Sequence, residues 1–255
     1  MSDKALAYPG MAGAGGTQAD AARRAGRNDM LLAGLTAGSG LLVLAAIWMV
    51  ANTPTEATMG LVQKVFYFHM PAAWAGFLAF VVTFGASVTY LVKRDVRADM
   101  VAVASAEVGL AFLTMAIISG SIWARPVWNT WWTWDARLTS TTICWLAYVA
   151  YFMLRGALDD PERARRLAAV YGIVAVVTVP MTFLSILLLR TIHPSLFGPQ
   201  EGAEIKMNMA PAMTRTLMFS LFAFTVFYAT LLWHRLRYEG LKRRIEQIRA
   251  VLSGQ

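Results

Sequence analysis

Six long apolar runs constrain the fold of this chain more than any other feature of its sequence. Each run is close to the roughly 20 apolar residues that an α-helix needs to cross the hydrocarbon core of a bilayer. Their approximate bounds are 30–51, 72–92, 101–122, 138–154, 167–189 and 212–233. The composition agrees, because 57% of the 255 residues are hydrophobic and 15% are charged. The sequence therefore predicts an all-α, polytopic integral membrane protein with six transmembrane helices.

The polar ends of the chain divide it into three regions. Residues 1–29 are rich in Gly and Ala and predict a disordered tail. They do not resemble a cleavable signal peptide, because the first apolar run is long enough to span a membrane. Residues 30–233 form a single membrane domain, and residues 234–255 predict a basic amphipathic tail. Such a tail suits anionic membrane lipid, and docking to a cytosolic ATPase is the alternative.

The distribution of Lys and Arg predicts how the spans are oriented. Of the 23 basic residues, 17 lie in the two tails or in the connections after the second and fourth runs. Basic residues gather on the cytoplasmic side of membrane proteins, so both termini are predicted to be cytoplasmic. The other connections then face outward, which in a bacterium is the periplasmic side. The net charge of +8 is mostly a topology signal and gives no reason to expect a nucleic-acid partner.

Tryptophan is concentrated in the connection between the third and fourth runs. Five of the nine tryptophans lie there within twelve residues: Trp123, Trp128, Trp131, Trp132 and Trp134. A membrane-interface belt usually places one or two such rings at the end of a span. Large flat rings also offer stacking faces for a large flat ligand. We predict that Trp128, Trp131, Trp132 and Trp134 hold a porphyrin, with an unusually rich aromatic belt as the alternative.

Two of the three histidines fall on the same predicted face as the tryptophans. His69 and His193 are in outward-facing positions, whereas His234 is at the inner end of the last run and is given no role. Two neutral imidazoles that approach a porphyrin from opposite faces supply both axial ligands to its iron. Either histidine alone would be an ordinary interfacial residue, but together with the tryptophans they predict a ligand pair. The thioether of Met70 is an alternative to His69.

Two segments carry a family resemblance. Residues 131–140 begin Trp-Trp-Thr-Trp-Asp and resemble the tryptophan-rich signature of the haem-handling proteins of bacterial cytochrome c maturation. Residues 66–74, around His69, resemble the first histidine motif of the haem exporter protein C family, and His193 falls where the second periplasmic histidine of that family is expected. The resemblance extends over roughly residues 60–233.

The resemblance implies a function in haem delivery. It implies that the chain holds haem, transiently and without a covalent bond, at the periplasmic face of the bacterial inner membrane. The haem would pass to a membrane-anchored haem chaperone, beside the membrane and ATPase subunits of an ABC transporter and a small single-span accessory subunit. The chain has no phosphate-binding loop of its own, so any use of ATP would come from a partner. No residue resembles a nucleophile or general base, which favours a binding and transfer component over an enzyme.

Charged residues beside the tryptophans allow two interpretations. Arg125 and Arg137 flank the cluster, where a guanidinium can meet a haem propionate or extend to lipid headgroups. Asp135 belongs to the signature and is therefore counted among the candidate haem-site residues, although its carboxylate would repel propionates. We therefore expect Asp135 to cap the following helix or to pair with Arg137.

Glu107 is the acidic residue that lies well inside an apolar run. An intramembrane carboxylate is a functional hypothesis by default. Contact with another subunit or with a polar path for haem is one interpretation, and protonation or a hydrogen bond to a neighbouring helix is the other.

Two other functions fit the same residues. A b-type cytochrome that transfers electrons would hold a permanent bis-histidine haem, but such histidines usually lie within spans, whereas His69 and His193 lie at predicted helix ends. A channel that conducts haem across the bilayer would use the same external site. The sequence leaves this second alternative open.

Overall fold

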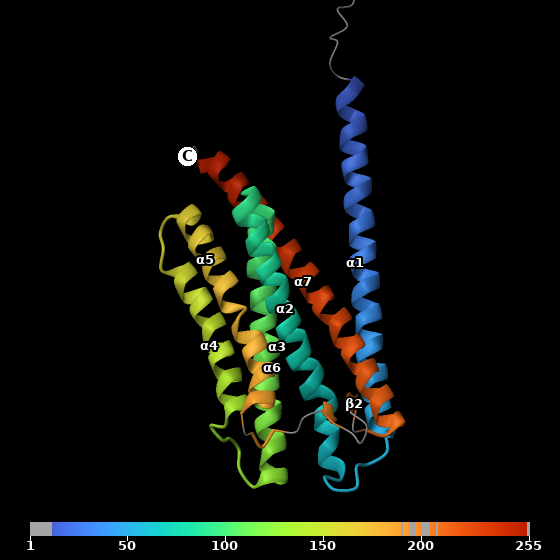
Figure 1. Ribbon diagram of the computed structural model, residues 1–255. Helices are drawn as coiled ribbons and strands as arrows, with labels where there is room; N and C mark the ends of the chain where they lie inside the picture. The colour runs from blue at the N-terminus through green and yellow to red at the C-terminus, as the bar shows by residue number, and fades with distance from the viewer. Residues whose placement is uncertain (1–11, 190, 194–196, 200–204, 208, 254–255) are drawn as a thin grey trace, which may run out of the picture.

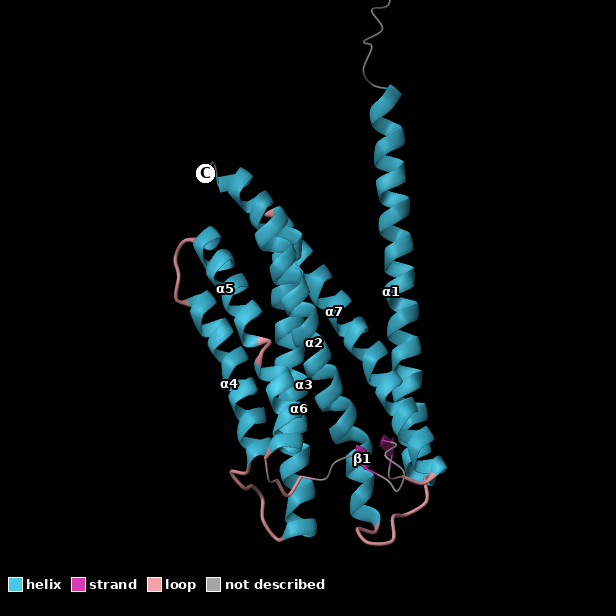
Figure 2. Cartoon of the chain, viewed as in Figure 1, coloured by secondary structure: helices cyan, strands magenta, loops and turns pink. Residues whose placement is uncertain are grey.

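The computed structural model describes residues 12–189, 191–193, 197–199, 205–207 and 209–253. Figure 2 shows that helices make up nearly all of this structure, which confirms the all-α prediction. A short antiparallel pair of strands, with Phe197 opposite Met207, lies in the connection before the last helix. The elements in chain order are α1 Ala12–Asn52, the 3-10 helix η1 Leu61–Val65, α2 Phe66–Lys93, α3 Val96–Trp128, α4 Ala136–Gly156, α5 Pro161–Ala175, α6 Thr178–Leu188, β1 Phe197–Pro199, β2 Ile205–Met207 and α7 Pro211–Ser253.

Five helical segments in the described residues are long and apolar enough to cross a membrane. They correspond to the first, second, third, fifth and sixth predicted runs, so the chain is a polytopic membrane protein. Helix α4 stands at the place of the fourth run but does not belong to these five. The reason is its polar start, because residues 139–142 all carry hydroxyl groups. Helix α4 packs along α5 and α6, and this position in the bundle is the basis for the prediction that α4 is a sixth span.

The fifth run contains a break that the apolar pattern did not reveal. The predicted span over residues 167–189 is present but is divided into two helices, because α5 ends at Ala175 and α6 begins at Thr178. Proline lacks a backbone N–H and its ring clashes with the carbonyl four residues earlier. Pro180 stands in the first turn of α6, so this clash falls at Val176, inside the break. The two helices together still have the length of one span.

The helices also extend further into the tails than composition indicated. Residues 12–29 belong to α1, so the predicted disordered tail is corrected there, while residues 1–11 lie outside the described residues. Alanine-rich sequence continues a helix readily once the adjoining span has nucleated it. The predicted amphipathic tail at the other end is helical, but it continues α7 without interruption to Ser253.

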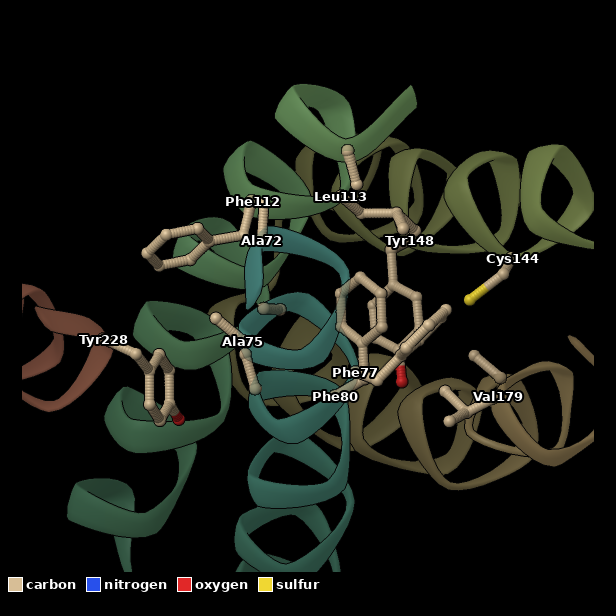
Figure 3. Packing of buried hydrophobic residues seen from close by; sticks show 14 of the residues in the cluster. Ala72, Ala75, Phe77, Phe80, Phe112, Leu113, Cys144, Tyr148, Val179 and Tyr228 are labelled. Carbon is tan, nitrogen blue, oxygen red and sulfur yellow. The ribbon is translucent and has the colours of Figure 1, made fainter. Parts of the chain in front are cut away.

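Helices α2 and α3 form the most extensive helix contact in the described structure. Small residues allow their backbones to approach closely, as at many helix interfaces within membranes. A Cβ added at Gly109 would lie 2.8 Å from the Cβ of Ala79, and one added at Gly76 would lie 3.2 Å from the carbonyl oxygen of Gly109. Phe80 of α2 also stacks on Tyr148 of α4, with ring centroids 3.4 Å apart; Figure 3 shows both residues in the packed core. The centre of the bundle is therefore filled with side chains.

The connections between the helices lie at the two ends of the bundle. In Figure 1 the connections α1–α2, α3–α4 and α6–α7 gather at one end, and the start of α1 and the end of α7 lie at the other. The arrangement agrees with the predicted alternation of the spans. It brings the segments that contain His69, the tryptophans and His193 together, and we call this part of the molecule the loop end.

A buried ion pair joins α3 to α4 near the opposite end. Two nitrogens of Arg155 donate to the two carboxylate oxygens of Asp99 at 2.7 and 2.6 Å. Asp99 is 2% exposed, so this bidentate geometry satisfies a carboxylate that would otherwise be costly to bury.

Helix α7 is held to its neighbours by further polar contacts. Arg235 donates to Glu107 of α3 at 2.7 Å, which agrees with the second of the two interpretations of Glu107, a bond to a neighbouring helix. The ring nitrogen Nε2 of His234 lies 2.7 Å from the hydroxyl of Thr36 on α1. His234 thus has a structural contact far from the loop end.

Candidate functional site

His69 lies in the first turns of α2, at the loop end. Its ring nitrogen Nδ1 is 2.9 Å from the carbonyl oxygen of Ala116 and 3.3 Å from the hydroxyl of Ser119, both on α3. A carbonyl oxygen only accepts hydrogen bonds, so Nδ1 carries the proton. The other ring nitrogen, Nε2, then keeps its lone pair for a metal.

His193 follows α6 in the connection to β1, and its ring faces that of His69. The two ring centroids are 6.2 Å apart, with an angle of 41° between the planes. An imidazole nitrogen binds a transition metal at about 2 Å, and the centre of the ring lies about 1 Å beyond that nitrogen. Two imidazoles on opposite sides of one metal atom therefore have ring centres about 6 Å apart. The separation therefore fits two imidazoles that share one metal atom between them. The predicted ligand pair is brought together although 124 positions separate the two residues in the sequence.

A cavity of about 650 Å³ opens beside the two histidines. Its volume lies within the range of small-molecule sites, about 300–1,000 Å³. Most of its lining comes from α2, α6, the start of α7 and the α1–α2 connection, and Trp123 of α3, Arg137 of α4 and both histidines also line it. Four methionines that the sequence analysis did not single out as a group also line it: Met59, Met70, Met209 and Met213. Methionine adapts its shape to irregular apolar ligands, so this wall suits a large flat molecule.

A smaller cavity of about 60 Å³ lies on the tryptophan side of the same histidines. Trp128 and Trp132 line it, whereas Trp131 and Trp134 are 59% and 73% exposed. The indole N–H of Trp132 is buried and has no hydrogen-bond partner among the described residues. The predicted cluster of four rings is therefore divided in two. One pair faces the histidines and the other faces outward.

Arg137 joins the two cavities and Arg125 does not. The guanidinium of Arg137 lines both cavities, donates to the carbonyl of Thr182 and lies 5.1 Å from the ring centre of Phe183. Arg125 instead donates to the backbone and side-chain oxygens of Asn129, at 2.7 and 2.6 Å, where α3 ends. Of the two predicted propionate ligands, only Arg137 is brought to the histidines.

An acidic side chain also lines the larger cavity. The carboxylate of Glu56 accepts backbone hydrogen bonds from Met59 at 2.5 Å and Thr58 at 2.8 Å. The bond from Met59 has the largest part in holding the pKa of Glu56 below its usual value, so this carboxylate is ionised at neutral pH. An anionic ligand group is therefore attracted to the Arg137 side of the cavity and repelled from the Glu56 side.

Asp135 has the capping role that the sequence predicted. Its carboxylate accepts the backbone N–H of Arg137 at 2.9 Å and of Leu138 at 3.1 Å, and so caps α4. It also accepts the backbone N–H of Ile192 at 3.4 Å and the hydroxyl of Thr133 at 3.2 Å. A single side chain thus connects the tryptophan-rich connection, the start of α4 and the segment that carries His193.

Sequence reasoning missed the residues that surround His69. Ala116 and Ser119 bind its ring nitrogen, and Trp123 of α3 lies beside it with ring centroids 6.1 Å apart. Ala116 and Ser119 have no distinctive local pattern, since Ala and Ser are common in apolar runs, and the tryptophan cluster contains Trp123 without indicating that it lies beside His69. Their proximity to His69 follows from the packing of α2 on α3 and has no signal in the sequence.

Comparison with known proteins identifies the family. The chain matches the family Heme exporter protein C (CcmC) over residues 18–251. It is 33% identical to Heme exporter protein C of Bradyrhizobium diazoefficiens over 223 residues, which cover 87% of this chain and 83% of the relative. The corresponding protein of Escherichia coli K12 is 33% identical over 199 residues, covering 77% and 78%, and that of Rhodobacter capsulatus is 31% identical over 203 residues, covering 79% and 83%. Because this match covers most of the chain, the chain belongs to the Heme exporter protein C (CcmC) family.

Proposed function

We propose that this chain binds haem at the loop end, between His69 and His193, and presents it to a membrane-anchored haem chaperone during cytochrome c maturation. Membership of the haem exporter family supports a role in haem export. The observation that carries the finer proposal is the distance of 6.2 Å between the two imidazole rings beside a cavity of about 650 Å³. Haem is the transient cargo of this site, and its iron would be bound by the two histidines as axial ligands.

Each residue of the site has a part in holding the cargo. His69 and His193 supply ligand nitrogens from opposite sides, and the methionines pack against the porphyrin. Arg137 binds a propionate as a charge-assisted donor, and its bond to the carbonyl of Thr182 already orients the guanidinium. Trp128 and Trp132 close the tryptophan side of the site.

The exposed tryptophans are suited to the partner. Trp131 and Trp134 expose 59% and 73% of their surface, which is unusual for large aromatic rings at a binding site. We assign to them the contact with the chaperone and with the outer edge of the bound haem. Transfer then relies on positioning, since holding the haem against the chaperone raises the effective concentration of the two reacting groups.

The remaining partners belong to the same proposal. The family's role in haem export suggests that the chain works with an ABC transporter, its membrane and ATPase subunits, and a small single-span accessory subunit. The inner membrane of a bacterium, with the loop end on the periplasmic side, is the location that the distribution of basic residues favours.

The alternatives find less support. A permanent b-type haem is usually held within helices, but His193 lies in a connection, which suits a ligand that is exchanged. A haem channel through this chain would need a path along its centre. That centre is occupied by fully buried side chains such as Phe80, Tyr148 and Tyr151.

The test compares the three histidines. The full chain is purified in detergent as His69→Ala, His193→Ala and His234→Ala variants, with and without the chaperone, and haem content and absorption spectra are measured. The first two variants should have a changed Soret band that added imidazole partly restores, because imidazole supplies the missing donor. The His234→Ala variant is the matched control and should keep the wild-type spectrum. Wild-type spectra for both His69→Ala and His193→Ala would overturn the proposal.

A further inference from the structure

The imidazole of His69 lies directly against the backbone of α3 at Gly120. A Cβ built on Gly120 would be 2.9 Å from Cε1 of His69 and 3.3 Å from its Nδ1. A contact under 3.0 Å between a Cβ and a ring carbon is not tolerated without movement of one of the groups. The ring therefore occupies space that only glycine leaves open at this position.

The ring is held from two further directions. Its Nδ1 is bound to the carbonyl of Ala116 and to the hydroxyl of Ser119. Trp123, which is 3% exposed, lies beside it at 6.1 Å between ring centroids. About two successive turns of α3 thus provide the hydrogen-bond acceptor, the slot and an aromatic neighbour for the same imidazole.

The position of the clash matters for ligation. Cε1 is the carbon bonded to both ring nitrogens, so a group that displaces Cε1 also displaces Nε2 and its lone pair. The same movement would stretch the hydrogen bond that holds the proton on Nδ1. Groups that orient a metal-binding histidine in this way affect metal affinity without touching the metal.

We propose that Gly120 is a positioning residue for haem binding, whose missing side chain forms the slot that fixes His69 with Nε2 directed to the site. Ala116 and Ser119 complete this function by keeping the proton on Nδ1. The inference rests on the proposed function, because it assumes that His69 is a haem ligand. It adds a role for α3, which supplies neither of the two proposed ligands.

A purely structural role for Gly120 has to be distinguished, since glycines also support the α2–α3 contact. Gly109 provides the matched control. A Cβ at Gly109 would lie 2.8 Å from the Cβ of Ala79 and 2.9 Å from Cε1 of Phe80, so it is equally crowded in the same helix pair but not against His69. Gly120→Ala and Gly109→Ala should both lower the melting temperature. The added substitution His69→Ala should restore stability to Gly120→Ala only, because it removes the ring that the new methyl group meets.

The experiment titrates the full chain in detergent with haem and records affinity and absorption spectrum for Gly120→Ala, Gly109→Ala, His69→Ala and the two double variants. Gly120→Ala should bind haem about 10- to 100-fold more weakly, the range typical of groups that orient a metal ligand. Its Soret band should move towards that of His69→Ala, and imidazole should reverse the shift. In the His69→Ala background, Gly120→Ala should cause no further loss.

A measurement without haem tests the same orientation. With three histidines in the chain, ¹⁵N-histidine NMR resolves each ring, and His69 should show a proton on Nδ1 in the wild type. Gly120→Ala and the milder Ser119→Ala should shift this resonance and leave that of His234 unchanged. Wild-type affinity and spectrum in Gly120→Ala, or an equal loss in the His69→Ala background, would overturn the role of Gly120. If His69→Ala itself keeps the wild-type spectrum, the ligand assignment fails instead.

Discussion

The carboxylate of Asp135 holds the first turn of α4 and the backbone N–H of Ile192 at the same time. Ile192 immediately precedes His193, so the cap of one helix also fixes the segment that carries a proposed haem ligand. This relationship explains why a carboxylate belongs in a tryptophan-rich connection that is proposed to face an anionic cargo. Its carboxylate accepts backbone N–H groups of Arg137, Leu138 and Ile192, so its charge has protein partners of its own.

Replacing Asp135 should therefore affect both stability and haem content. Asp135→Ala removes the cap and should cost about 1 kcal/mol of stability, the typical value for a lost N-cap. Asp135→Asn retains a good cap and should cost much less. Thermal melting in detergent and haem quantification test the pair. Equal damage from both substitutions would show that the charge, and not the cap, is what the site requires.

Arg137 and Arg125 should differ in their effect on haem binding. Arg137→Gln should weaken binding about tenfold or more, because hydrogen bonds to charged groups contribute about 1.5–3 kcal/mol. Arg125→Gln should leave binding nearly unchanged, since Arg125 is bound to Asn129 and lines neither cavity. Titration with haem dimethyl ester is the decisive control. The esterified ligand has no carboxylate, so a persistent difference between wild type and Arg137→Gln would exclude propionate binding.

The four tryptophans of the predicted cluster should separate into two functional pairs. Trp128→Ala and Trp132→Ala should reduce bound haem, because these rings line the cavity beside the histidines. Trp131→Ala and Trp134→Ala should retain haem but slow the formation of the haem–chaperone adduct. Membrane insertion should be normal in all four variants. If every variant loads the chaperone at the wild-type rate, the rings serve only as interfacial anchors.

The orientation of the bundle can be measured with a reporter that is active only in the periplasm. Fusions near Trp128 and Gly198 should be active, and fusions near Asp159 or after Gly240 should be inactive. The basis for this prediction is that 17 of the 23 basic residues lie in the two tails or in the connections after the second and fourth apolar runs, which are predicted to be cytoplasmic. Activity at Asp159 would contradict the assignment of α4 as a span and place the histidines apart from the tryptophans.

The buried pair of Asp99 and Arg155 should matter for folding but not for haem. Asp99→Ala leaves the Arg155 guanidinium without its carboxylate and should cost about 3–5 kcal/mol. The double variant Asp99→Ala, Arg155→Met should recover most of this loss, because neither charge then remains. Melting temperature reports the stability, and the Soret band of the folded fraction should stay unchanged. A spectral change in the double variant would indicate coupling between the two ends of the bundle.

The sequence by itself determined the class of the protein and most of the spans, and it predicted part of the candidate site, including His69, His193 and Arg137. Apolar runs of membrane length reveal spans because the bilayer imposes their length, and clustered tryptophans with two histidines mark one connection of the chain. The cap at Asp135 was also local, since it depends on a few adjoining residues. The helix break at Val176 and Val177 and the helical residues 12–29 were missed, because a short apolar pattern records neither a kink nor the extension of a helix beyond its span.

Only the tertiary structure decided which of these residues meet. It brought Arg137 to the histidines and left Arg125 at the end of α3, although the sequence places both arginines equally close to the tryptophans. It also turned Trp132 inward and Trp131 outward, a choice that neighbouring identical residues cannot encode locally. The slot at Gly120 arises from the close approach of α2 and α3. Such contacts depend on how whole helices pack, so they follow from the fold and not from spacing along the chain.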